Sequence, residues 1–276
     1  MWPYAMLTPF GVCYALFTLW PIARTLRLSV GHYGEALAQP LVWLAAANTI
    51  GFALVFALVQ TLLALAAALL IEASPRRLAT PLAALAFATH LLGGTFAGVV
   101  FAAMLSGRGG LVNATLLKLN LVDSPIGWLT TPALAMPVLI VVAAYVGFGF
   151  GTIYLLAALR RADRDLLDAA RVDGAGPVRR TWSVTVPQLR PTLAVLFLAA
   201  VFWGLQAFEL PYVLFGGPGP SYRVLTAAML VFSVGFERGE LGQASAIATL
   251  LAMTILIVVG GLALLFRVGR EEVTLA

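Results

Sequence analysis

The residues best suited to contact another molecule lie in one polar segment of the chain, residues 163–191. In its first ten residues, apolar side chains recur at helical spacing opposite a polar face, which predicts a short amphipathic helix with acidic residues near its start. Small side chains at Ala169, Ala170 and Gly174 would let another protein approach closely, and Asp168 offers a polar contact. The segment therefore predicts a docking surface, and the alternative is an ordinary solvated helix.

The residues that follow this helix predict where it ends. Gly174 and Gly176 can end it in left-handed conformations, and Pro177 is well placed to begin a second helix. Pro187 and Pro191 are then expected to break the chain. The expected arrangement is two short surface helices joined by a tight glycine turn.

Residues with the spacing of a catalytic or metal site are lacking in the sequence. No phosphate-binding loop of the Walker type occurs, so the chain is not expected to hydrolyse ATP itself. No cluster of His, Asp and Glu suits a metal ion, and no nucleophile and base pair suggests itself. Cys13 is the only cysteine, which excludes an intrachain disulfide. The sequence therefore predicts neither an enzyme nor a cofactor-binding protein.

The composition predicts an all-α integral membrane protein. Of 276 residues, 61% are apolar and only 11% are charged, against about 25% charged residues in a typical soluble domain. Crossing the hydrocarbon layer takes about 20 apolar residues, and the backbone there must bond internally as a helix. We read the chain as a single transmembrane domain, residues 1–276, with six helices at about 4–26, 42–71, 82–105, 132–159, 192–215 and 241–266.

The distribution of basic residues predicts the orientation of these helices. Six crossings place both termini on one side, together with the loops after the second and fourth helices. That side holds 11 of the 17 basic residues, namely Arg76, Arg77, Arg160, Arg161, Arg164, Arg171, Arg179, Arg180, Arg190, Arg267 and Arg270. Positive charge favours the cytoplasmic side. The loop 160–191 and both termini are therefore expected in the cytoplasm.

The spacing within this loop resembles the EAA loop of ABC importer permeases. Residues 168–170 stand for the Glu-Ala-Ala triplet, Gly174 for the glycine that follows, and residues 184–187 for the closing Ile-x-Leu-Pro, with Asp for Glu and Val for Ile and Leu. Residues 208–220 resemble the pattern of sugar permeases after this loop, and residues 241–251 resemble the last helix of the family. The resemblance covers nearly half of the chain.

The resemblance implies a type I ABC importer permease fold, in which the EAA loop between helices four and five couples to a cytoplasmic ATPase. The coupling residues would be Asp168, Ala169, Ala170, Arg171, Asp173, Gly174 and Ala175. The implied partners are a second permease subunit in a heterodimer, two ATPase subunits that use ATP and Mg²⁺, and an extracytoplasmic substrate-binding protein. The implied location is the cytoplasmic membrane of a bacterium or archaeon, and nucleic acid is not among the expected partners.

The resemblance also implies a sugar or related carbohydrate as the transported solute. Aromatic faces pack on the apolar face of a pyranose, and amides bond its hydroxyl groups. The candidates for the pathway are Tyr145, Gly147, Phe150, Trp203, Gln206 and Glu209, the last of which is an ionisable residue within the fifth expected span. The alternatives are aromatic core packing for the rings and a wetted helix end for Glu209.

Other classes of function remain open from the residues. A polyol phosphate or a polyamine could replace the sugar. An ion-coupled secondary transporter would be expected to carry mid-membrane carboxylates in several helices, and a membrane enzyme would need a polar catalytic set within its spans. The G-x-x-x-G pairs Gly94/Gly98 and Gly147/Gly151 predict close helix packing. The sequon at Asn113 is attributed to chance.

Overall fold

The computed structural model describes residues 2–107 and 109–267, and every regular element in those ranges is a helix. Four of its helices are long and apolar enough to cross a membrane: Pro40–Ala73, Pro132–Arg161, Pro177–Leu205 and Leu241–Phe266. The first two are α4 (Pro40–Ala73) and α8 (Pro132–Arg161), and the last lies in α14 (Leu241–Arg267). Helices α4, α8 and α14 correspond to the second, fourth and sixth expected spans.

The third expected span is not one straight helix. It consists of α5 (Arg76–His90) and α6 (Gly94–Met104), which meet at an angle of 92° and make a fifth crossing only if the pair is counted as one span. The bend coincides with Gly93, whose φ of +67° is a left-handed conformation that glycine adopts without a steric cost. The prediction of a continuous helix over 82–105 was therefore wrong.

The fifth expected span begins and ends earlier than predicted. Helix runs from α10 (Pro177–Arg180) through the π turn η2 (Thr181–Thr185) into α11 (Val186–Leu205), so Pro187 and Pro191 do not break it. The π turn, in which Val186 N–H bonds the carbonyl of Thr181, widens the helix directly before Pro187, where a proline ring would crowd an α turn. The chain leaves the helix at Gln206 and resumes in a separate helix, α12 (Glu209–Phe215).

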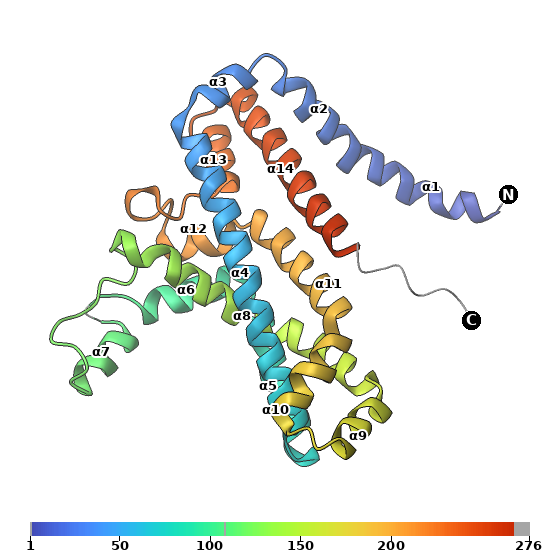
Figure 1. Cartoon of the computed structure of the whole chain (residues 1–276). Coiled ribbons are helices and arrows are strands. Elements are labelled where there is room, and N and C mark those ends of the chain that lie inside the picture. Colours follow the sequence, from blue (N-terminus) through green and yellow to red (C-terminus); the bar gives the residue numbers. More distant parts are fainter. Residues whose placement is uncertain (1, 108, 268–276) are drawn as a thin grey trace.

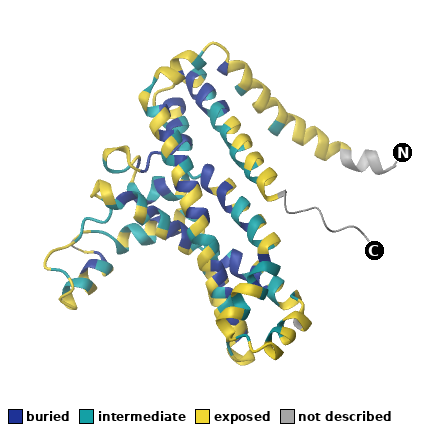
Figure 2. Cartoon of the chain, viewed as in Figure 1, coloured by how far each residue is buried: buried dark blue, intermediate teal, exposed yellow. Residues whose placement is uncertain are grey.

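The first expected span lies in a helical stretch that is divided by a π turn. Helix α1 (Trp2–Tyr14) is followed by η1 (Ala15–Leu19) and α2 (Trp20–Ser29), and the stretch is not among the helices that meet the length and composition of a span. It packs against α14 through α2, and nearly all side chains of residues 8–28 are exposed (Figures 1 and 2). A membrane crossing here, and with it the total of six, stays a prediction.

Glycines let the central helices approach closely on two sides of α8. A Cβ on Gly147 would lie 2.6 Å from Gln60 Oε1, and one on Gly151 would lie 2.9 Å from Ala64 Cβ, both on α4. A Cβ on Gly149 would collide with the backbone carbonyl of Ala86 on α5. The close packing predicted for the Gly147/Gly151 pair is confirmed, and Gly94 and Gly98 of α6 likewise lie against α12.

The hydrophobic core follows the same contacts. Phe52, Leu139 and Val201 pack between α4, α8 and α11, and a second group that includes Leu65, Leu155 and Leu189 lies farther along the same helices. Helices α9 and α10 lie beyond this second group, near the start of α5 (Figure 1). At the opposite end, α3 (Tyr33–Ala38), α13 (Ala227–Phe232), the π turn η4 (Ser233–Glu237) and the start of α14 form a third group.

A single buried asparagine organises the segment between α6 and α8. Asn113, on α7 (Leu111–Lys118), is fully buried; its Nδ2 donates to the carbonyls of Gly107 and Ile126, each at 2.9 Å. Its Oδ1 accepts from Ile126 N–H and Trp128 Nε1, each at 3.1 Å. An asparagine held in this way cannot carry a glycan in the folded protein, which agrees with attributing the sequon to chance.

Candidate coupling surface and solute pathway

Helix α9 (Arg164–Val172) is the amphipathic helix that the sequence predicts, and its first residues explain where it begins. Asp163 is the N-cap, and its Oδ1 accepts from Asp165 N–H at 2.9 Å. This bond satisfies one of the free N–H groups of the first turn. One turn later, Arg171 Nη1 lies 2.6 Å from Asp168 Oδ1 within the same helix. The Asp168–Arg171 ion pair is therefore internal to α9 and exposed to solvent.

The far end of α9 explains the spacing between residues 168–170 and Gly174. Ala175 N–H donates to the carbonyl of Ala170 at 3.0 Å, and Gly174 N–H donates to that of Arg171 at 3.1 Å. This pair of bonds is a Schellman motif, which places a left-handed residue after the helix. Gly174 has a φ of +73°, as expected, whereas Gly176 has a φ of −64°, so its predicted left-handed conformation was wrong. Asp173, directly before Gly174, is the C-cap residue.

Apolar side chains remain uncovered around α9. Leu166 and Val172 on α9, Val178 on α10 and Trp182 in η2 are all exposed, Val172 by 88%. Isolated exposed apolar residues are ordinary, but a cluster of them at one end of the folded molecule is typical of a protein-binding surface. These residues share the α9 end of the molecule with the small side chains that the sequence singled out.

A hollow separates α9 from the ends of the long helices. Its volume is about 460 Å³, and it is lined by Glu72 at the end of α4, by Asp168 and Arg171 on α9, and by Thr185 in η2. Across its rim, Arg160 Nε of α8 lies 3.4 Å from Glu72 Oε2, with both side chains about half exposed. An exposed pair of this kind contributes little stability, and because it joins α4 to α8 it does not hold α9.

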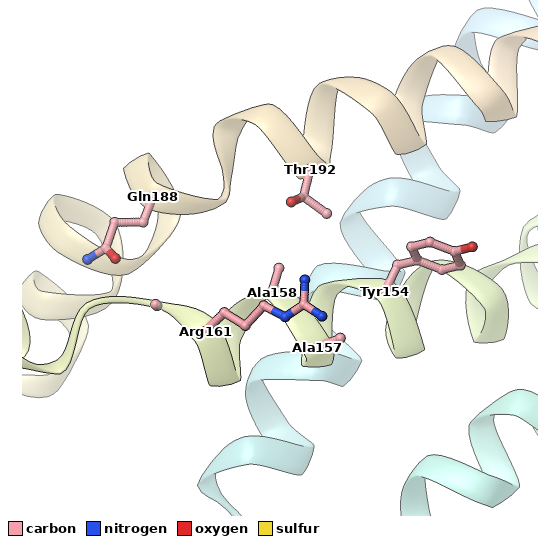
Figure 3. A pocket seen from close by; sticks show the side chains of 7 residues that line it. Tyr154, Ala157, Ala158, Arg161, Gln188 and Thr192 are labelled. Carbon is pink, nitrogen blue, oxygen red and sulfur yellow. The ribbon is translucent and has the colours of Figure 1, made fainter. Parts of the chain in front are cut away.

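A second hollow of about 490 Å³ lies between α8 and α11 at the same end of the molecule. Figure 3 shows Tyr154 and Arg161 on α8 and Gln188 and Thr192 on α11 along its walls. Gln188 Oε1 accepts from the backbone N–H of Asp163 at 2.9 Å, which connects the start of α9 to α11. Sequence reasoning missed Gln188, because only the folded chain brings it to Asp163.

The structure divides the six pathway candidates into separate groups. The Phe150 ring lies 5.2 Å from the ring of His90, and the Trp203 ring lies 5.8 Å from it, measured between centroids. Tyr145 instead packs edge-on against Phe101 of α6 at 5.5 Å, and Gly147 faces α4. The polar atom His90 Nδ1 is buried without a hydrogen-bond partner among the described residues. Phe150, Trp203 and His90 thus form one aromatic cluster at the bend between α5 and α6.

Gln206 and Glu209 lie on either side of the break between α11 and α12. Gln206 is exposed, and its Nε2 donates to the carbonyl of Phe202 at 3.1 Å. The sequence placed Glu209 inside the fifth span, but it lies in the exposed first turn of α12. Its Oε2 lies 3.4 Å from Thr95 Oγ1 on α6. The helix ends at Leu205, so Glu209 belongs to a separate element that packs on α6.

Comparison with known proteins decides which family this architecture represents. A family model described as "Binding-protein-dependent transport system inner membrane component" matches residues 60–268, which is more than half of the chain. The chain belongs to this family. It is therefore an inner-membrane permease component of an ABC importer, and in this family ATP hydrolysis resides in a separate subunit.

Several permeases of this family are similar over most of their length. The lactose transport system permease protein LacF of Rhizobium radiobacter is 28% identical over 81% of this chain and 79% of its own. The trehalose/maltose transport system permease protein MalF of Thermococcus litoralis is 28% identical over 97% and 93%. The arabinooligosaccharides transport system permease protein AraP of Bacillus subtilis is 26% identical over 93% and 85%.

A solved structure shares the fold of this permease. A chain of a bacterial ABC transporter involved in the import of the acidic polysaccharide alginate superposes with a TM-score of 0.87 at 21% identity, covering 98% of this chain and 95% of that chain. The same fold occurs in the alginate transporter in complex with a periplasmic protein bound to an alginate pentasaccharide, again with a TM-score of 0.87. The type I ABC importer permease fold expected from the sequence is confirmed.

Proposed function

We propose that this permease forms half of the translocation pathway for a sugar or related carbohydrate. The observation that carries the solute class is the set of similar permeases, whose names specify lactose, trehalose/maltose and arabinooligosaccharides. The aromatic cluster of Phe150, Trp203 and His90 supports the same class, because exposed ring faces pack on the apolar faces of pyranose rings. A polyol phosphate or a polyamine is the alternative solute.

We also propose that α9 is the coupling helix, which docks on a cytoplasmic ATPase. Three features support this role: the Schellman motif at Gly174, the small side chains Ala169 and Ala170, and the exposed apolar side chains around them. The coupling surface comprises Asp168, Ala169, Ala170, Arg171, Asp173, Gly174 and Ala175. ATP and Mg²⁺ would be bound by the ATPase and not by this chain.

The remaining partners follow from the same assignment. A second permease would complete the pathway as a heterodimer, two ATPase subunits would drive it, and an extracytoplasmic binding protein would deliver the solute. Large apolar side chains on α14, such as Leu256 and Ile257, are exposed in the single chain and are suited to lipid or to a second permease. The complex would lie in the cytoplasmic membrane of a bacterium or archaeon, with α9 and both termini in the cytoplasm.

The permease would alternate between an outward-facing and an inward-facing state as the coupling helix moves. An ATPase that binds this helix differently in its ATP-bound and ATP-free states shifts the equilibrium between the two permease states. The helix is suited to move as a unit, because a side-chain cap at its start and the Schellman motif at its end satisfy part of its terminal backbone groups. The aromatic cluster lies on the helices that such a movement would displace.

Purification of the tagged chain from its native host in mild detergent tests this proposal. We expect an ATPase with Walker motifs, a second permease and a binding protein to co-purify, and the ATPase to be lost when Asp168 and Gly174 are both replaced. Recovery of the intact chain alone, under conditions that preserve a known ABC complex, would contradict the proposed assembly. Uptake of labelled sugars by proteoliposomes holding the purified complex then tests the solute class.

A further inference from the structure

We propose that Gln188 is a positioning residue that clasps the coupling helix to α11, so that movement of α9 is carried directly into a membrane span. The inference rests on the proposed function, because that function gives α9 a movement to transmit. It concerns one hydrogen bond, from the backbone N–H of Asp163 to Gln188 Oε1 at 2.9 Å, between residues 25 positions apart in the sequence.

Asp163 serves the start of α9 in two ways at once. Its side chain caps the helix through Asp165 N–H, and its own N–H is held by Gln188. The residue that begins the coupling helix is therefore the residue attached to α11. Among the residues whose side chains the structure describes, this is the one hydrogen bond that joins α9 or its N-cap to α11. Without the Gln188 side chain, α9 and α11 would be connected only by packing and by the backbone that runs between them.

The connection through the chain contains two places where movement can be absorbed. From α9 it passes through the glycine turn at residues 174–176 and then through the π turn η2. Pro187 and Pro191 also remove backbone donors at the start of α11, which weakens the helical ladder there. Prolines and π turns are the usual places at which a helix kinks. Gln188 lies beyond the π turn, so its bond to Asp163 bypasses both the glycine turn and η2.

The far end of α11 carries a member of the aromatic cluster. Trp203 lies 15 residues after Gln188 in the same helix, which corresponds to about 22 Å at the helical rise per residue. Beyond Gln188, α11 is packed along its length against α4 and α8. Helix α11 is continuous past Pro191 up to Leu205, so a displacement at Gln188 would reach Trp203 and its contact with His90 as a movement of one helix.

The chemistry of the clasp requires a hydrogen-bond acceptor at residue 188. Because the partner is a backbone N–H, the atom that faces it must be the amide oxygen. The other atom of the amide, Nε2, is buried without a hydrogen-bond partner among the described residues. Gln188 therefore makes its one observed bond through Oε1, and Met, which has similar length and no such acceptor, would remove the bond while filling the space.

The test uses the complete transporter, with its ATPases, second permease and binding protein, reconstituted in proteoliposomes. The measured quantity is the number of solute molecules imported per ATP hydrolysed, compared at equal amounts of assembled complex. For Gln188→Met we expect the ATPase to remain bound and this ratio to fall about three- to tenfold, the population change that corresponds to one hydrogen bond. A merely structural role would lower the yield of complex and leave the ratio unchanged.

Two substitutions at Asp163 examine the same bond from the donor side. Asp163→Pro removes the N–H, and the backbone accepts proline, since φ is −64° at Asp163 and Ala162 has φ −59° and ψ 144°. Asp163→Ala keeps the N–H and, like the proline variant, loses the capping side chain. We expect the proline variant to lower the import ratio and the alanine variant to retain it. In the double variant Gln188→Met with Asp163→Pro, the import ratio should fall no further than in either single variant.

Three results would overturn the clasp: an unchanged ratio in Gln188→Met, equal losses in Asp163→Pro and Asp163→Ala, or additive losses in the double variant. These outcomes differ from failure of the proposed function. If the proposed function fails, the ATPase does not co-purify even with the unaltered chain, whereas all three results against the clasp are obtained with the ATPase bound.

Discussion

The side-chain amide of Gln60 on α4 donates to the backbone carbonyl of Gly147 on α8 at 3.2 Å, and a Cβ at residue 147 would collide with this amide as it stands. Gly147 was a candidate for the solute pathway, and the structure instead places it between two long helices. Next to it, Gly149 faces α5 in the same way. The glycines of α8 thus set the spacing of three helices, and Phe150, a candidate for the pathway, lies on the same helix.

Gly149→Ala is expected to destabilise the permease by about 1–3 kcal/mol, the usual cost of overpacking a close contact. The added Cβ would meet the backbone carbonyl of Ala86, which cannot move as a side chain can. Thermal unfolding of the purified chain in detergent measures the effect. Gly260→Ala is the matched control, since nothing lies within 4 Å of its added Cβ, and equal stability of the two variants would contradict the packing role.

Gly174→Ala is expected to reduce ATPase binding while membrane insertion stays normal. A non-glycine residue in the left-handed region costs about 1–2 kcal/mol, and φ at this position is +73°. The Schellman motif that ends α9 would then open. Co-purification of the ATPase and the yield of membrane-inserted protein are the two measurements. Gly176→Ala, at φ −64° with open space around it, should bind the ATPase normally.

Gly174→Asp places a charged residue in the same left-handed conformation. We expect the variant protein to insert into the membrane normally and to lose coupling to the ATPase. If this variant instead fails to insert, Gly174 has a structural role in folding, and its assignment to the coupling surface is wrong. Insertion is measured by extraction of washed membranes with alkali and by protease protection of the loops. Coupling is measured as stimulation of ATP hydrolysis by the solute-loaded binding protein.

Asn113→Ala is expected to loosen the segment between α6 and α8 and to lower stability by about 2–4 kcal/mol. The substitution leaves the N–H of Ile126 and the indole N–H of Trp128 without their acceptor. Both residues are half-buried, so each unsatisfied group is expected to cost about 1–2 kcal/mol, the lower part of the range for such groups. Limited proteolysis of the segment 106–131 measures the loosening. Thr115→Ala on the same helix, whose hydroxyl is exposed, should leave the cleavage rate unchanged.

Trp203→Leu is expected to lower solute uptake by about tenfold with little change in the yield of complex, because the ring would be lost from the cluster with Phe150 and His90. Loss of an aromatic stacking contact of about 1–1.5 kcal/mol corresponds to that factor. The neighbouring Phe202 is also exposed and lies outside this cluster, so Phe202→Leu is the control. Equal uptake by both variants would remove Trp203 from the pathway.

Helix α9, the proposed coupling helix, was the part of the candidate site most accessible to prediction. Its amphipathic pattern, its acidic start and its glycine end are local features, and local hydrogen bonds decide them. The continuous helix through Pro187 and Pro191 was not predicted, because a proline disfavours an α turn locally, and the π turn that accommodates it is recognised only in the folded chain. The bend at Gly93 was missed for a similar reason, since glycine within an apolar run fits both a straight and a bent helix.

The sequence by itself determined that this protein spans a membrane, that its long apolar segments are helices, and that residues 163–172 form an amphipathic helix that ends before Gly174. Composition and short-range periodicity suffice for these conclusions, because lipid forces the backbone to bond within each segment. Only the tertiary structure decided that Gly147 packs on Gln60, that Phe150 and Trp203 meet at His90, and that Gln188 holds the N–H of Asp163. These contacts join residues far apart in the chain. Which residues meet depends on the crossing angle and the rotation of each helix, and an apolar helix without a distinct polar face does not encode these on its own.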